Sequence, residues 1–158
     1  MIEVTGGTKK QRELVQSIAE YSAVKLMGAR LASVVEITIE LRHDLGTSLG
    51  NATWEDDNHR PREFTIEVNA DKNLRLRKIL ETVAHEMVHV KQFAKGEMKD
   101  LISRPANIRK WMGKEIDMNA ISYWDLPWEI EAYGREAGLF VRWAEENELA
   151  NEEWTHDV

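Results

Sequence analysis

Residues 76–93, LRKILETVAHEMVHVKQF, are the most strongly patterned segment of this chain. Their apolar side chains recur at the i, i+3, i+4, i+7 spacing that one buried face of a helix requires. The residues of this stripe are Leu76, Ile79, Leu80, Val83, Met87 and Val90. We therefore predict a helix that begins between Asp71 and Asn73, continues to about Phe93 and is terminated by Gly96.

A second helix is predicted near the start of the chain. Thr8 and Gln11 form a capping-box pair, which is typical of a helix N-terminus. Apolar residues at helical spacing follow over residues 9–27, and Gly28 is the expected stop.

Two strands are predicted between these helices. Apolar and polar residues alternate over residues 35–41 and again over residues 64–70, as in half-buried strands. Gly46, Gly50 and Asn51 lie between them and predict a turn region.

The C-terminal part of the chain predicts a loop, a helix and a tail. Residues 97–123 have weak periodicity and are expected to be mostly loop. The last helix should open at Asp125 or Leu126, carry Pro127 in its first turn and continue to about Glu146. The acidic tail, residues 147–158, is expected to be loose. Helices at both ends around a small antiparallel or mixed sheet indicate an α+β fold.

The composition is that of one globular domain. A chain of 158 residues is long enough to bury one core and short enough to make a second domain unexpected, so we predict a single domain over residues 1–158. The hydrophobic fraction of 42% and the charged fraction of 31% are typical of soluble proteins. No apolar run has membrane-spanning length, and the N-terminus lacks the pattern of a signal peptide. We therefore expect a cytoplasmic protein without a membrane partner.

Charge and cysteine content restrict the partners further. The net charge of −7 argues against a nucleic-acid partner, because phosphate binding requires clustered Lys and Arg. The absence of cysteine excludes disulfides and thiolate ligands. Any bound metal must therefore be held by His, Asp or Glu.

The segment His85-Glu86-Met87-Val88-His89 has the spacing of a metal site on a helix. Two histidines four residues apart lie on one helix face, so both imidazoles can reach one ion. The glutamate after the first histidine can then hold and deprotonate a water molecule. At about 100° per residue, both histidines project away from the apolar stripe and are expected to face a cleft. The preceding strand could pair with an extended substrate. The alternative is a pair of surface histidines on an amphipathic helix.

A catalytic zinc site needs a third protein ligand, which we expect to be a carboxylate. The other histidines, His43, His59 and His156, lie outside the predicted helices. The last helix offers Glu129 and Glu131. Its inward face is predicted from its apolar residues, which are Ile130, Tyr133, Ala137, Phe140 and Ala144. Glu129 lies at the border of that face and Glu131 points away from it, so Glu129 is the preferred ligand and Glu131 the alternate. The alternative is that neither binds a metal and both are ordinary first-turn glutamates, which the helix dipole favours.

The His85–His89 segment followed by a helix that carries Glu129-x-x-Ala132 resembles the gluzincin branch of the zincin metallopeptidases. It is most similar to the small single-domain minigluzincins and to metallopeptidases encoded by bacteriophages. The resemblance implies a zincin-like fold, one catalytic Zn²⁺ held by His85, His89 and Glu129, Glu86 as general base, and a peptide or protein substrate. Related proteins often carry Asp or Asn where this chain has Tyr133, so the partner that orients the ligands is not identified.

Three other interpretations compete with this one. The SprT-like proteases share the histidine motif, but they usually continue into a cysteine zinc ribbon that this chain cannot form. A zinc-containing, catalytically silent binding or regulatory protein on the same fold is the alternative function, and a metal-free domain with incidental histidines is a third. The presence of Glu86 favours a hydrolase, because a purely structural zinc does not need that carboxylate.

Several other residues are candidates for the site. Tyr123, Tyr133 and Arg135 could donate to the oxyanion that develops during hydrolysis, although a structural role is the more common one for each. Trp111 and Trp124 flank the loop before the last helix and are the preferred candidates for a side-chain pocket.

Overall fold

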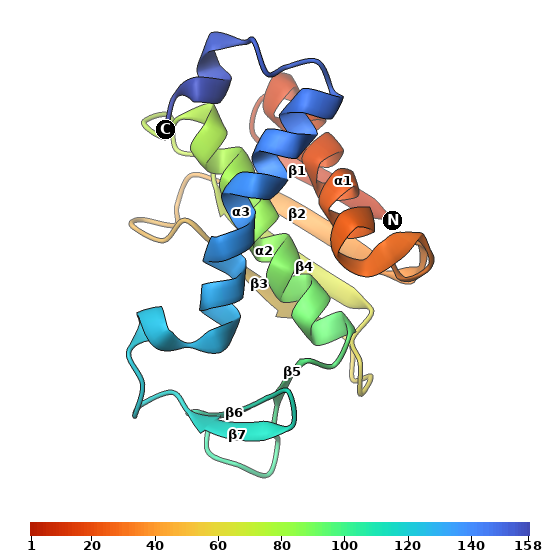
Figure 1. The fold of residues 1–158 in the computed structure, drawn as a ribbon, viewed down its shortest axis with the longest axis vertical. Coiled ribbons are helices and arrows are strands. Elements are labelled where there is room, and N and C mark those ends of the chain that lie inside the picture. Colours follow the sequence, from red (N-terminus) through yellow and green to blue (C-terminus); the bar gives the residue numbers. More distant parts are fainter.

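Three helices and two small sheets make up the α+β fold of the computed structural model, which describes all residues 1–158 (Figure 1). The helices are α1 (Lys9–Val34), α2 (Leu76–Ala94) and α3 (Pro127–Glu146). Helices α1 and α2 pack on the larger sheet, and α3 packs on α2. The core lies between the sheet and α1 and α2, and it continues into the contact between α2 and α3.

The larger sheet is mixed and has the strand order β1-β2-β4-β3. Its strands are β1 (Ile2–Gly6), β2 (Glu36–Arg42), β3 (Gly50–Trp54) and β4 (Glu63–Asn69). Strands β1, β2 and β4 are parallel, whereas β3 pairs antiparallel with β4 and forms one edge of the sheet. Alternate residues of β2 and β4 are buried, which confirms the two strands predicted from the period of two.

The edge strands β1 and β3 were not predicted. Residues Gly50 and Asn51, interpreted as part of a turn, open strand β3 instead. The sequence Gly-Asn-Ala-Thr-Trp of β3 contains three residue types that strands disfavour, so its pairing depends on β4 and not on local propensity.

Helix α1 has the capping box predicted at Thr8 and Gln11. The predicted stop at Gly28 is wrong, because the helix kinks there and resumes as far as Val34. Gly28 has φ 81° and ψ 159°, a conformation that glycine adopts without steric cost, so it interrupts the helix without ending it.

Helix α2 is buried around almost its whole circumference from Ile79 to Ala94. It begins at Leu76, later than predicted, because the carboxylate of Asp71 accepts from the N–H of Asn73 in a turn ahead of the helix. Its end at Ala94, followed by Gly96 at φ 72°, agrees with the prediction.

Helix α3 begins at Pro127 and ends at Glu146, as predicted, but its inward face was predicted correctly only at Phe140 and Ala144. Ile130 is 56% exposed and Ala137 is also exposed. The buried face consists of Trp128, Glu129, Ala132, Leu139, Phe140, Trp143 and Ala144. Glu129 therefore lies within the buried face and not at its border.

Residues 97–123 contain a second sheet where a loop was predicted. Strands β5 (Met98–Asp100), β6 (Ile108–Trp111) and β7 (Lys114–Asp117) are antiparallel and lie beyond the C-terminal end of α2 (Figure 1). These strands have only three or four residues each, and most of their residues are charged, so the alternation that marks a strand is absent. A short 3₁₀ helix, η1 (Tyr123–Asp125), then leads into α3.

The tail was expected to be loose, but it packs on the domain. It contains the 3₁₀ helix η2 (Glu153–His156), and Thr155 is buried. The guanidinium of Arg77 donates to the carbonyl of Thr155 at 2.8 Å, and the ring of Trp154 lies 6.3 Å from that of Phe140. This apolar contact and hydrogen bond explain why an acidic segment is held. No helix of the chain has the length and apolar character to cross a membrane.

Candidate metal centre

His85 and His89 of α2 meet Glu129 of α3 where the two helices pack together. One ligand atom of each residue lies within 4.8 Å of the others, which is compatible with a shared metal ion. His89 Nε2 is 2.7 Å from Glu129 Oε1, and His85 Nε2 is 3.5 Å from Glu129 Oε2. His85 is 7% exposed and Glu129 is 6% exposed, because α3 covers this face of α2. The group is a candidate site for a metal ion that takes nitrogen and oxygen ligands.

The other ring nitrogen of each histidine is held by a neighbouring side chain. His85 Nδ1 donates to Glu136 Oε2 at 2.8 Å, and His89 Nδ1 donates to Gln92 Oε1 at 2.8 Å. These bonds direct both Nε2 atoms toward Glu129. Metal-binding histidines commonly have such a partner on the remaining nitrogen, where it sets the ring orientation and raises the basicity of the ligand.

Glu136 and Gln92 were missed in the sequence. Their spacing could have revealed them, since Gln92 lies seven residues after His85 and Glu136 lies seven residues after Glu129. Positions i, i+4 and i+7 share one helix face, so polar groups at these positions of two packed helices converge.

The electrostatics of the centre depend on burial and on these hydrogen bonds. Burial alone would lower the pKa of His85, but its bonds to Glu129 and Glu136 outweigh that effect and raise the pKa to about 9. For Glu129, burial acts to raise the pKa, whereas hydrogen bonds from His85 and His89 hold it well below its usual range. Glu129 is therefore a carboxylate at neutral pH, as a metal ligand must be.

Glu86 is 5% exposed and lies beside the centre on α2. Burial raises the pKa of its carboxyl group, while the adjacent His85 and His89 act in the opposite direction. Gly50 of strand β3 approaches it closely, because a Cβ at that glycine would lie 3.3 Å from Glu86 Oε1. The edge strand thus passes directly over this carboxylate.

Tyr123 and Tyr133 lie at the centre, whereas Arg135 does not. The hydroxyl of Tyr123 donates to Glu129 Oε2 at 2.7 Å, and the ring of Tyr133 packs edge-on against His85 at 4.6 Å. Burial, followed by the bond to Glu129, raises the pKa of Tyr123. Arg135 is half exposed and donates to Glu131, so it does not point toward the centre as an oxyanion donor would.

Glu131, the alternate ligand, lies outside the group of three. Its carboxylate accepts from Lys91 Nζ at 2.7 Å and from Gln92 Nε2 at 3.0 Å. It therefore supports the amide that holds His89, although the sequence predicted only that it points away from the inward face of the helix. The same amide also donates to the carbonyl of Trp128 at 3.0 Å.

Two cavities flank Glu86 and form the two sides of a cleft. One has a volume of about 290 Å³ and is lined by the 47–50 segment, α2 and α3. The other has a volume of about 410 Å³ and is lined by β3, the end of α2 and the second sheet. Both are bordered by Gly50, His85, Glu86 and Tyr123. The cleft therefore runs past the candidate centre along the β3 edge.

The aromatic residues of the cleft are not the two predicted. Trp54 and Phe93, whose rings lie 4.6 Å apart, line the larger cavity. Trp111 instead packs against Trp128 at 6.1 Å, and Trp124 is 67% exposed beside Tyr133. Trp54 was missed because strand β3 was not predicted.

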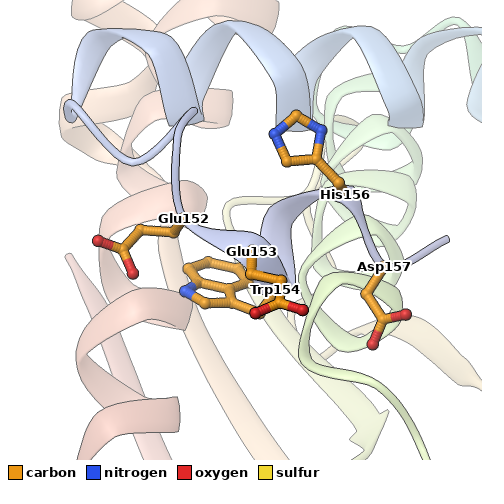
Figure 2. Close-up of a pocket in the computed structure, with 5 residues that line it drawn as sticks. All are labelled: Glu152, Glu153, Trp154, His156 and Asp157. Atoms are coloured by element: carbon orange, nitrogen blue, oxygen red, sulfur yellow. The ribbon is translucent and has the colours of Figure 1, made fainter.

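A further cavity of about 580 Å³ lies at the C-terminal segment (Figure 2). Its lining side chains all come from this segment and are Glu152, Glu153, Trp154, His156 and Asp157. It shares no lining residue with the cleft beside Glu86. Its size alone does not indicate a site, because it lacks converging groups from other elements.

No known protein family, curated protein or solved structure matches this chain. The function must therefore be inferred from the residues of the centre and from the cleft around it.

Proposed function

We propose that this protein is a zinc-dependent metallopeptidase with a zincin-like fold. The observation that carries the proposal is the convergence of His85, His89 and Glu129, with the Nδ1 atom of both histidines already held by a neighbouring side chain. Surface histidines on an amphipathic helix would not be buried and oriented in this way. The position of Glu86 in the cleft beside these residues adds a base to the ligand set.

The donor set fits zinc. Two imidazole nitrogens and one carboxylate oxygen are the ligands of many catalytic zinc sites, which keep one coordination position open. His85, His89 and Glu129 would hold the ion, and Glu136 and Gln92 would orient the histidines. A bound zinc ion supplies Lewis-acid chemistry, which makes water more acidic and polarises a peptide carbonyl.

The residues of the chain then carry specific roles. Glu86 accepts the proton of the attacking water, and burial favours this role because it raises the pKa of the carboxyl group. Tyr123 is the donor best situated for the developing oxyanion, because its hydroxyl lies 2.7 Å from the ligand carboxylate of Glu129. That hydroxyl has one proton, which would turn from Glu129 Oε2 to the oxyanion as the negative charge develops. Tyr133 holds the ring of His85 by edge-on packing.

The shape of the cleft supports an extended peptide as the substrate. Strand β3 has a free edge beside Glu86, and a peptide could add to it as a further strand. Gly50 allows this edge to approach the carboxylate of Glu86 closely. The backbone of the substrate would then lie along the candidate centre.

Cleavage of a peptide library by the wild type and by Glu86→Gln tests the proposal. The variant should retain zinc and lose activity by about 10²-fold or more, as expected when a general base is removed. Glu145→Gln is a matched control, because Glu145 is an exposed residue of α3 far along the helix from the centre. Undiminished turnover by Glu86→Gln would overturn the mechanism. Stoichiometric zinc without any cleavage would instead favour a zinc-containing, catalytically silent binding protein.

A further inference from the structure

Lys78 is the one lysine or arginine that lines the smaller cavity of the cleft. The rest of its polar lining includes the hydroxyl-bearing residues Thr47, Ser48 and Thr82. Its two carboxylates are Glu86, at the candidate centre, and Glu136, which accepts from His85. The cavity therefore combines the positive charge of Lys78 with hydroxyl groups beside the candidate centre.

Lys78 differs from the other cations of helix α2 because it has no ion-pair partner. Arg77 pairs with Glu81 at 2.5 Å, and Lys91 pairs with Glu131 at 2.7 Å. No carboxylate lies within 4.0 Å of the Lys78 ammonium group, although the residue is half-buried. A half-buried lysine without a partner can still gain from an incoming anion.

The larger cavity also contains a cation, but its charge is already balanced. Arg109 donates from Nε to Asp100 Oδ1 at 2.6 Å, and its guanidinium lies over the ring of Trp128 at 5.2 Å. A substrate carboxylate there would meet Asp100. Anions should therefore be attracted to the smaller cavity, which Lys78 lines, and not to the larger one.

The direction of strand β3 indicates which part of a bound peptide would reach Lys78. A peptide that adds antiparallel to β3, the more stable pairing, would run from the Trp54 end of that strand toward the Gly50 end. Its residues after the scissile bond would then enter the cavity that Lys78 lines. Lys78 lies seven residues before His85 on the same helix face, roughly 10 Å along the axis. An extended chain covers that length in about three residues.

We propose that Lys78 makes this cavity a subsite for a carboxylate group that follows the scissile bond. The carboxylate belongs either to an acidic side chain or to the free C-terminus of the peptide. This inference rests on the proposed function for its substrate, and it names the chemical class that the peptidase prefers.

The test compares peptides that differ only in this charge. Two pools of random decapeptides are used, one containing Asp and Glu and the other containing Asn and Gln in their place. Each pool is made with a free and with an amidated C-terminus. The proteins are the wild type, Lys78→Ala, Lys78→Glu and the control Lys72→Glu, which changes the charge equally at an exposed residue before α2.

The wild type and Lys72→Glu should cleave the favoured acidic peptides with a kcat/KM about tenfold above that of the neutral ones, a typical effect of one partly desolvated charge pair. Lys78→Ala should abolish the preference, and Lys78→Glu should reverse it, while both keep their zinc. If cleavage depends on Asp and Glu in the peptide, the subsite binds an acidic side chain. If it depends on a free instead of an amidated C-terminus, the subsite binds the terminal carboxylate. Equal cleavage of all pools by the wild type would overturn the inference and leave the peptidase intact.

The inference remains testable if no peptide is cleaved, an outcome that would reject the proposed function. Binding of the same four pools to zinc-loaded protein would then be measured by competition with a fluorescent acidic decapeptide. Stronger binding of acidic peptides that disappears in Lys78→Ala would support the subsite. Equal binding of the acidic and neutral pools would overturn it.

Discussion

Replacement of Glu136 by alanine should weaken zinc binding without removing a metal ligand. Glu136 Oε2 accepts from His85 Nδ1 at 2.8 Å, and both side chains are largely buried. The bond orients the imidazole and raises its basicity, so its loss weakens the hold on the His85 ring and makes its Nε2 a poorer ligand. Loss of such a partner typically reduces metal affinity about 10- to 100-fold, which corresponds to about 1.4 to 2.7 kcal/mol.

The zinc Kd of each variant can be measured by competition with a chromophoric chelator, with circular dichroism as a check of the fold. Glu136→Gln keeps an acceptor for His85, so it should reduce the zinc affinity by only about tenfold, the smallest loss in that range. Glu145→Ala removes an exposed carboxylate of the same helix and should leave the Kd unchanged. A Kd for Glu136→Ala within about twofold of the wild type would refute the assigned role of Glu136.

The same structure supports four further predictions. Gly50→Ala should destabilise the fold by about 1–3 kcal/mol in urea titrations, because its Cβ would lie 2.8 Å from the carbonyl oxygen of Glu67. Gly134→Ala should instead stabilise the fold by about 0.5–1 kcal/mol, because nothing lies within 4 Å of that helical position; destabilisation would contradict the packing described. Zinc binding near pH 7.5 should release about one proton, because the His85 pKa of about 9 leaves that residue mostly protonated. Calorimetry in two buffers of different ionisation enthalpy measures this release, and its absence would contradict the raised pKa. In zinc-free protein, the stability that protonated His85 provides is complete below about pH 6.5 and is lost as the pH rises through about 9, so His85→Ala should flatten this dependence.

The parts of the fold that were predictable have strong local patterns. The stripe from Ile79 to Val90 is buried as expected, and the alternation in β2 and β4 corresponds to their buried faces. The capping box at Thr8 and the proline at residue 127 located two helix starts. In each case, the geometry is specified by residues within a few positions of one another.

The parts that were missed depend on contacts between distant segments. Strand β3 forms because β4 offers its free edge, and the second sheet consists of strands too short for a recognisable period. The tail is held by Arg77, which lies 78 residues before Thr155. Such contacts leave no periodic pattern in the sequence of either segment.

The candidate site also combines residues that a local pattern predicts with residues that depend on contacts between distant segments. The spacing of His85, Glu86 and His89 specifies their relative positions in space, because one helix carries all three. Glu129 was selected with an inward face of α3 that the structure corrects, yet it is the carboxylate that meets the histidines. The role of Glu136 depends on how α3 packs against α2, which helical spacing can suggest but does not determine.

The zinc content of tag-free protein purified without added metal tests the central claim most directly. Elemental analysis should find roughly one zinc per chain in the wild type and in His43→Ala, which changes an exposed histidine outside the centre. His85→Ala should lose nearly all of the zinc, because it removes one of the three protein ligands. A wild-type protein that is fully folded, contains no zinc and fails to bind it when it is supplied would contradict the account.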